Sequence, residues 1–327
     1  MQLVLSERST LKYNEKRFCH RWCPEIFTGF RNSLQNAILA LLCGLIFQCM
    51  QTDDLSNILV EQRAIFSRFL KRYVIVDCYL PKNIAHPASL SLLLINDGQD
   101  LEDMHFTKIL NGLLESSQIR PLLCVGIHAN KYRKHEYGTA GEPDFAGRGD
   151  RAGLFQQFVL EELLPYLHTA YAIEGFVQKG YCGFSLGGLS AFDIAYHNPD
   201  VFQITGVFSG SLWWRSKDLG DGYHDDQHRI VHQRVRRNAF HPGQRYYLMT
   251  GSMDETADRN NNGIIDSIDD TLDLIAELKN KGVDETKSIH YINYEDGKHD
   301  VPSWGRAIPA FLLWGWPLVA EYSDMTK

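Results

Sequence analysis

The sequence predicts an α/β fold in which helices cover both faces of a mostly parallel central sheet. From residue 58 onward, apolar β-branched segments of strand length alternate with segments whose apolar residues recur at helical spacing. Several strand segments are apolar almost throughout, which is typical of strands covered on both faces. Repeated strand–helix alternation, with no internal sequence repeat, indicates βαβ units and hence a parallel sheet.

The elements are expected in the following order along the chain. Strands are expected at residues 73–80, 90–95, 121–127, 179–184, 204–208, 245–249 and 288–294. Helices are expected at residues 104–115, 155–167, 186–197 and 272–282. Pro81 ends the first strand and Gly282 ends the last helix, because these residues disfavour continuation. Residues 56–327 are therefore expected to form one domain.

Residues 1–55 form an N-terminal extension whose role the pattern does not define. Basic residues outnumber acidic ones over residues 1–34, and an apolar run follows at residues 37–47. This order resembles a signal peptide, but the basic region is long and no small-residue cleavage site follows. We therefore expect a cytoplasmic protein, with export or membrane association through residues 37–47 as the alternative.

Composition excludes several classes of protein and partner. The 327 residues are 44% hydrophobic and 22% charged, which excludes collagen-like and extensively disordered chains. The formal net charge of -7 argues against a nucleic-acid partner, because phosphate binding requires a concentrated excess of Lys and Arg. No apolar run reaches about 18 residues, so no integral membrane span is expected. The oligomeric state stays open.

The segment 183–187, Gly-Phe-Ser-Leu-Gly, matches the G-x-S-x-G pattern between an expected strand and an expected helix. Flanking glycines allow the sharp turn that lifts the serine hydroxyl into a cleft. The N-terminus of the helix also directs N–H groups toward an oxyanion. Ser185 is therefore the candidate nucleophile. The alternative is a packing or phosphate-binding turn, but neither G-x-G-x-x-G nor a P-loop is present.

A serine nucleophile needs a base, and the chain order in α/β-hydrolases is serine, acid, histidine. His299 follows the last expected strand and is the candidate base, whereas His290 lies within that strand. Asp254 follows the strand at residues 245–249 and is the favoured acid, with Glu255 as the alternative. A buried carboxylate there would orient the imidazole and stabilise its protonated form.

Two backbone N–H groups are candidates for an oxyanion hole. One belongs to Leu186, directly after the candidate nucleophile. The other belongs to Gln99, in the loop that follows the strand at residues 90–95. Gly98 precedes it and allows the main chain to approach closely. A plain Asp-Gly turn is the alternative interpretation of this loop.

Five segments in this order resemble the putative esterase family of α/β-hydrolases, which includes enterochelin esterase-like, esterase D-like and feruloyl esterase-like enzymes. They are Asn96–Gln99, Arg133-x-x-Glu136-Tyr137, Gly183–Gly188, Phe208–Trp214 and Gly297–His299. The resemblance covers about residues 58–316. It implies an α/β-hydrolase fold and a serine carboxylic-ester hydrolase with an acyl-enzyme intermediate. Ser185, His299 and Asp254 would then form the triad.

The resemblance also implies a small-molecule ester as the partner, and no cofactor is required for catalysis. Asn96 stands where the more common form of this segment, His-Asp-Gly, has histidine. The difference affects the loop geometry on which the role of the Gln99 N–H group as an oxyanion donor depends. Two other functions stay open. One is an acyltransferase with the same triad, in which an acceptor alcohol replaces water. The other is a non-catalytic binding protein that keeps the hydrolase fold.

Basic and aromatic residues near the expected cleft are candidate substrate contacts. Arg133 is a candidate for binding an anionic group, with pairing to Glu136 as the alternative. Tyr137, Trp213 and Trp214 are candidates for stacking on aryl or sugar groups, with core packing as the alternative.

Residues 258–269 follow the order of an EF-hand calcium loop. Oxygen-bearing side chains stand at the expected ligand positions, namely Asp258, Asn260, Asn262, Asp266 and Asp269. This pattern indicates a candidate structural Ca²⁺ site. Asp in place of Glu at the last position, and a strand rather than a helix before the loop, weaken it. The alternative is a polar turn in which Asp269 caps the following helix.

Overall fold

The computed structural model describes residues 57–82, 89–220, 222–239 and 241–318. These residues lie within one compact unit, Ser56–Lys327. The expectations for residues 1–55 and their apolar run at residues 37–47 fall outside the described residues.

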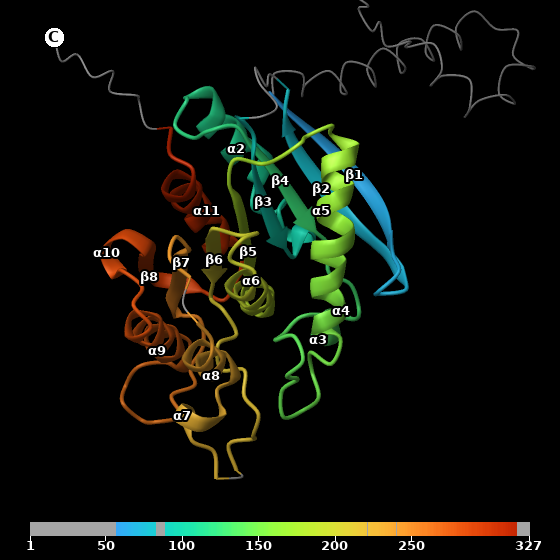
Figure 1. Ribbon diagram of the computed structural model, residues 1–327. Coiled ribbons are helices and arrows are strands. Elements are labelled where there is room, and N and C mark those ends of the chain that lie inside the picture. Colours follow the sequence, from blue (N-terminus) through green and yellow to red (C-terminus); the bar gives the residue numbers. More distant parts are fainter. Residues whose placement is uncertain (1–56, 83–88, 221, 240, 319–327) are drawn as a thin grey trace, which may run out of the picture. The chain divides into compact units, whose positions relative to one another are not determined.

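Eight strands of the described chain form one sheet in the order β1-β2-β4-β3-β5-β6-β7-β8 (Figure 1). Their bounds are β1 (Ile58–Ser67), β2 (Arg72–Pro81), β3 (Ser91–Asn96), β4 (Leu122–Ile127), β5 (Lys179–Phe184), β6 (Ile204–Phe208), β7 (Arg245–Met253) and β8 (Ile289–Lys298). β2 pairs antiparallel with β1 and β4, and the other neighbours pair parallel. The predicted mostly parallel sheet is confirmed.

The predicted strands are all present, but β1 was not expected from the sequence. It lies at the edge of the sheet, and its side chains are mostly exposed apart from Ile58, Ile65 and Ser67. Its apolar residues stand in two short groups, residues 58–60 and 64–66, separated by polar residues 61–63, and this pattern is neither a continuous apolar run nor a strict alternation. β7 and β8 continue beyond the expected ends at residues 249 and 294. His299 therefore follows a strand directly rather than lying inside a loop.

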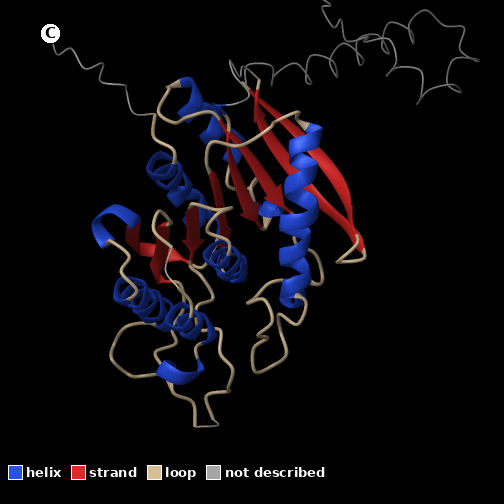
Figure 2. Ribbon diagram, in the orientation of Figure 1, coloured by secondary structure: helices blue, strands red, loops and turns tan. Residues whose placement is uncertain are grey.

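Helices cover both faces of the sheet, as Figure 2 shows. Their bounds are η3 (Gly98–Asp100), α2 (Phe106–Glu115), α3 (Arg133–Glu136), α4 (Ala152–Gln157), η4 (Phe158–Leu163), α5 (Leu164–Ala170), α6 (Leu186–His197), α7 (Asp225–His228), α8 (Ile230–Arg237), α9 (Asp266–Asn280), α10 (Glu285–Ser288) and α11 (Val301–Gly315). The helix expected at residues 155–167 runs from α4 through the wider turns of η4 into α5. α11 was not expected as a helix.

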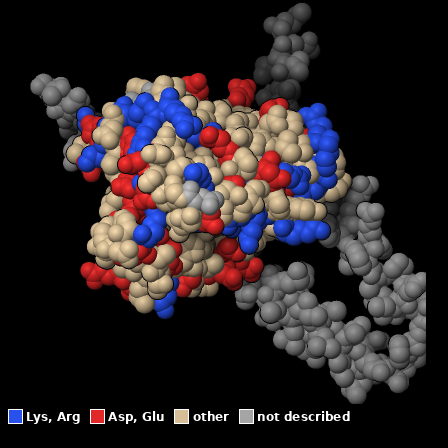
Figure 3. Space-filling model, turned by 90° about the horizontal axis from the view of Figure 1, so that it is seen from below, with Lys and Arg blue, Asp and Glu red and all other residues tan. Residues whose placement is uncertain are grey.

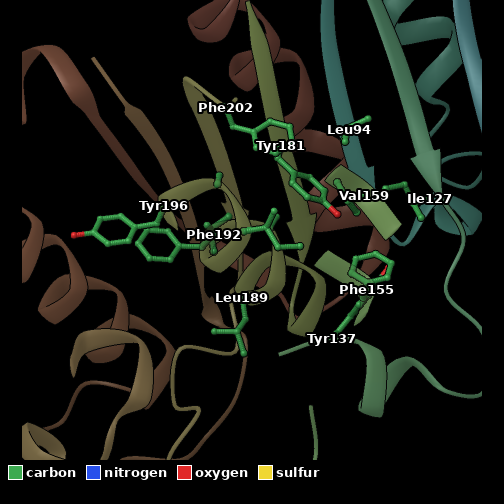
Figure 4. Packing of buried hydrophobic residues seen from close by; sticks show 14 of the residues in the cluster. Leu94, Ile127, Tyr137, Phe155, Val159, Tyr181, Leu189, Phe192, Tyr196 and Phe202 are labelled. Atoms are coloured by element: carbon green, nitrogen blue, oxygen red, sulfur yellow. The ribbon is translucent and has the colours of Figure 1, made fainter. Parts of the chain in front are cut away.

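Two apolar clusters fill the space on either side of the sheet. Along β3, Leu92 and Leu94 belong to one cluster, with α4–α6, α8 and α9, whereas Leu93 belongs to the other, with α2 and α11. Figure 4 shows part of the first cluster, where the rings of Tyr181 and Phe202 lie 5.3 Å apart between centroids. Successive side chains of this fully buried strand thus enter opposite clusters, as expected for a central strand that is covered on both faces.

The surface shown in Figure 3 carries acidic and basic side chains that are intermixed. Exposed charged side chains also form local ion pairs, such as Arg306 with Asp296. None of the helices in the described ranges combines the length and apolarity of a membrane span.

Candidate active site

Ser185 lies on the sharp turn between β5 and α6, with φ 54° and ψ -121°. A Cβ on Gly183 would lie 2.5 Å from the carbonyl carbon and oxygen of Gly187, so both faces of this turn need glycine. The backbone of Ser185 donates to the carbonyl of Phe208 (2.9 Å) and accepts from the N–H of Ser211 (3.1 Å). These bonds hold a strained conformation, as is typical of functional turns.

Ser185, Asp254 and His299 line the same pocket, whose volume is about 320 Å³. They follow β5, β7 and β8, whose carboxyl ends meet at one edge of the sheet. The other lining residues are Ser209, Gly210, Ser211, Trp213, Glu255 and Ser267. The structure thus brings together three residues that lie far apart in the sequence.

The ends of β7 and β8 approach closely at two glycines. A Cβ on Gly297 would lie 2.9 Å from the Cα of Gly251. The pairing register of the two strands also shifts between Gly251 and Met253. This close backbone contact brings the residues that follow the two strands, Asp254 and His299, to the same pocket.

Asp254 is held by two hydrogen bonds. The hydroxyl of Ser209 donates to Oδ1 (3.0 Å), and the N–H of Gly251 donates to Oδ2 (3.0 Å). Burial raises the pKa of Asp254, and the two donors and nearby His299 oppose that rise by favouring the charged form. Two hydrogen bonds therefore orient the carboxylate of Asp254 and stabilise its negative charge before any substrate binds.

His299 is oriented by an aromatic neighbour and titrates below its ordinary range. Its ring meets the ring of Trp304 edge-on, with centroids 5.2 Å apart. Desolvation lowers the pKa of His299, while Asp254 raises it and Arg133 lowers it further. The imidazole is therefore neutral at pH 7, as a general base must be.

The hydroxyl of Ser185 lies 3.4 Å from the hydroxyl of Ser211. Within the described ranges, no hydrogen bond joins His299 to Ser185 or to Asp254. Catalytic hydrogen bonds are often long in unliganded enzymes and tighten when substrate binds, so this spacing does not exclude either role.

The two expected oxyanion donors have different positions. Leu186 is the first residue of α6, where helical N–H groups lack intrahelical acceptors. Gln99 lies in η3 and borders a separate pocket of about 670 Å³ rather than the pocket of Ser185. Its N–H group stays a prediction. Two residues of this segment reach the turn: Asn96 donates to the carbonyl of Gly187 (2.9 Å), and the carboxylate of Asp97 lies where a Cβ on Gly187 would stand.

Arg133 pairs with Asp97 and not with Glu136. Its guanidinium donates to both carboxylate oxygens of Asp97 (2.7 Å each) and to the carbonyl of Phe184 (3.3 Å). Glu136 pairs with Arg72 instead. The alternative pairing expected from the sequence is therefore wrong, because the fold brings β2 to Glu136.

Tyr137 and Trp214 do not lie at the pocket. Their relative exposures are 1% and 0%. Tyr137 packs on Phe155 with centroids 5.1 Å apart (Figure 4), and its hydroxyl accepts the N–H of Asp97 (3.2 Å). Trp213 does line the pocket. The guanidinium of Arg148 lies 4.9 Å from its ring, so one face of Trp213 already has a partner.

Glu255, the alternative acid, also borders the pocket. Its Oε1 is buried without a hydrogen-bond partner among the described residues. Burial raises the pKa of Glu255, and the neighbouring carboxylates of Asp266, Asp270 and Asp254 raise it further. Asp254 is the better-oriented carboxylate of the two, because it holds two hydrogen bonds and interacts electrostatically with His299.

Each candidate calcium residue has a hydrogen-bond or ion-pair partner in the structure. The side-chain NH₂ groups of Asn260 and Asn262 donate to Asp269 (2.9 and 2.8 Å). Asp258 accepts backbone N–H groups, and Asp266 pairs with Arg259. Ca²⁺ requires oxygens directed at one point, whereas two of these side chains direct NH₂ groups at Asp269; this arrangement does not support the candidate Ca²⁺ site, which stays a prediction. No cluster of three or more His, Cys, Asp or Glu suited to a metal occurs in the described part of the chain.

The cap expected at Asp269 is also absent. The residue before the first turn of α9 is Ile265, and Asp269 lies inside that turn. The helix thus begins earlier than residue 272, at which the apolar spacing first becomes visible. Acidic residues in a first turn still stabilise a helix through its dipole.

Several residues at the site received no individual role from the sequence. Asp97, Ser209 and Ser211 belong to the quoted segments, but their partners come from distant elements. Trp304 follows the histidine segment and contacts His299 from α11, although it does not line the pocket. The only signal in the sequence was their proximity to the motifs.

The strand order, the turn at Ser185 and the pocket define an α/β-hydrolase. Residues 67–314 match the family model described as Putative esterase. The chain belongs to this esterase family, as its motifs predicted. A search of curated proteins gives no match.

Solved structures share the fold at low sequence identity. Enterobactin esterase FES from Shigella flexneri, solved with enterobactin, has 21% identity and a TM-score of 0.61, covering 81% of this chain and 60% of that chain. An IroE-like serine hydrolase from Shewanella oneidensis has 19% identity, a TM-score of 0.59 and 79% coverage of both chains. Siderophore hydrolase EstB from Aspergillus nidulans has 16% identity and a TM-score of 0.58, covering 80% and 96%. The chain thus corresponds to 60% of the length of the Shigella protein.

Proposed function

We propose that the protein is a serine carboxylic-ester hydrolase that acts through an acyl-enzyme. The observation that carries the proposal is one pocket lined by Ser185, His299 and Asp254, with the serine on a strained turn. Membership of an esterase family supports the same reaction. The choice of Asp254 over Glu255 rests on its two hydrogen bonds and its electrostatic interaction with His299.

In the proposed reaction, Ser185 Oγ attacks the ester carbonyl carbon while His299 takes the hydroxyl proton. The carbonyl electron pair moves to oxygen, and the Leu186 N–H stabilises the negative charge. The intermediate collapses as the C–O bond breaks, and His299 gives its proton to the departing alcohol. Water then attacks the acyl-enzyme by the same route, releasing the acid and restoring Ser185. Asp254 stabilises the imidazolium throughout.

We propose esters whose acid part carries a hydroxylated aromatic ring as the first substrates to test. Two proteins of similar structure support this choice, an enterobactin esterase and a ferulic acid esterase. The pocket is lined by several hydroxyl groups and one partly exposed aromatic ring, that of Trp213. Hydroxyls of such an acid can exchange hydrogen bonds with Ser211 and Ser267, which suits a small polar aromatic group.

The first experiment labels the purified protein with a fluorophosphonate and locates the added mass by peptide mapping. We expect the adduct on Ser185 and its loss in Ser185→Ala and His299→Ala. Ser211→Ala is the matched control, because it removes the neighbouring hydroxyl 3.4 Å away and should leave the adduct on Ser185. An adduct only on another residue, or none after long exposure, would contradict the proposal.

A second experiment follows the products of an ester panel with and without an added polyol. Free acid as the main product in both conditions supports hydrolysis. Transfer of the acyl group to the polyol as the main product would instead indicate an acyltransferase with the same residues.

A further inference from the structure

Trp304 contacts three parts of the proposed active site at once. Its ring stacks on Phe184, the residue before the nucleophile, with centroids 5.4 Å apart and an interplanar angle of 22°. It meets the ring of His299 edge-on at 5.2 Å and 82°. Its Nε1–H donates to the hydroxyl of Ser209 (3.0 Å). With only 7% of its surface exposed, this side chain has little freedom to move.

Ser209 connects Trp304 to the proposed acid. Its hydroxyl accepts from Trp304 and donates to Oδ1 of Asp254 (3.0 Å). A hydroxyl has one proton, so accepting from the indole leaves that proton free to point at the carboxylate. The backbone of Ser209 is fixed in the left-handed region at φ 46°, where its N–H donates to Met249 of β7 (2.8 Å). Ser209 is only 1% exposed, so its side chain has little freedom to move.

We propose that Ser209 and Trp304 form a positioning pair that holds Asp254 and His299 in their working orientations, a role that rests on the proposed esterase function. The pair acts on the acid through a chain of two hydrogen bonds, each of which polarises the next. It acts on the base by limiting rotation of the imidazole against the indole ring. One side chain of α11 therefore links the last residue of β5 with the residues that follow β6, β7 and β8.

The test uses Ser209→Ala and Trp304→Phe, each made in the natural chain and in Asp254→Asn. Phenylalanine keeps an aromatic ring beside His299 and removes the donor together with the second ring of the indole, a loss of volume that the control variant below shares. Trp316→Phe is the matched control, because Trp316 is buried in the same apolar cluster and its Nε1 has no hydrogen-bond partner among the described residues. Thermal unfolding of every variant shows whether it is folded.

We expect Ser209→Ala and Trp304→Phe each to lower kcat about 10-fold, as for one hydrogen bond to a charged group, with little change in KM. The double variant should lose no more than either single one, because both changes break one chain. In Asp254→Asn, neither change should lower kcat further. Trp316→Phe should match the natural chain.

The pH profile separates positioning from a general structural loss. Removing the Ser209 donor raises the pKa of Asp254. The carboxylate charge is then less stabilised by hydrogen bonds and acts more strongly on the imidazolium of His299, which raises the pKa of His299. The acidic limb of kcat/KM therefore moves to higher pH. The other titratable groups around these two are Glu255, Arg133, Asp300 and Tyr291, and all are unchanged.

Unchanged kcat in both single variants would overturn the inference. So would a loss that is equal at all pH values and persists in Asp254→Asn. The rate of fluorophosphonate labelling at Ser185 gives the same comparison without any substrate. Absence of labelling in the natural chain would contradict the proposed function itself, whereas normal labelling of Ser209→Ala and Trp304→Phe, with slower labelling of Asp254→Asn, would contradict only the positioning pair.

Discussion

Asp270→Asn should destabilise the protein far more than the matched change Asp273→Asn. Both carboxylates lie on α9 and accept from Arg229, Asp270 at 2.7 Å and Asp273 at 2.6 Å. Asp270 is fully buried and also accepts from Arg259 (3.1 Å), whereas the side chain of Asp273 is 53% exposed. The two substitutions therefore test burial at nearly constant hydrogen-bond length.

The magnitude follows from what each substitution leaves behind. Asp270→Asn leaves two guanidinium groups facing a neutral side chain, and Arg229 is itself only 2% exposed. Breaking a buried pair in this way costs about 3–5 kcal/mol of unfolding free energy. Loss of the exposed partner costs about 0–1 kcal/mol, because water replaces it. Urea unfolding followed by circular dichroism measures both values. A difference of less than about 1 kcal/mol between the variants would refute the argument.

Three further predictions concern the turn, the base and the calcium loop. Gly183→Ala should abolish fluorophosphonate labelling, because the new Cβ lies 2.5 Å from the Gly187 carbonyl, whereas Gly153→Ala, with nothing within 4 Å, should label normally and unfold at higher temperature. Because desolvation lowers the pKa of His299 from 6.5, kcat/KM should rise with pH along a limb centred below about pH 6.5, and a limb centred above pH 7 would contradict this. EDTA and millimolar CaCl₂ should leave the unfolding temperature unchanged, because the loop side chains satisfy one another; a saturable rise that Asp258→Ala removes would show that the loop binds Ca²⁺.

The interior of the sheet was predictable because its strands carry their own signal. β5 and β6 begin and end at the expected residues, since buried parallel strands are continuously apolar. β1 carries a weaker signal, because polar residues 61–63 interrupt its apolar residues, and most of its side chains are exposed at the edge of the sheet. α11 was missed as a helix: its sequence contains Pro302 and Pro309, which tertiary packing against the sheet tolerates.

The candidate site was predictable as far as local geometry defines it. The spacing of glycines around Ser185 requires a tight strand–helix turn, and the structure contains that turn with φ 54°. The positions of Asp254 and His299 after strands also followed from the chain order, and both line the pocket of Ser185. The individual roles of these residues remain predictions for the labelling and kinetic experiments.

The sequence by itself determined the alternation of strands and helices, the turn at Ser185 and the membership of the esterase family. These features depend on neighbours within a few residues, where backbone geometry and periodic burial leave a pattern. Only the tertiary structure decided that Arg133 binds Asp97 and that Ser209 joins Asp254 to Trp304. Such partners are chosen by strand order and packing between distant segments, which no local spacing records.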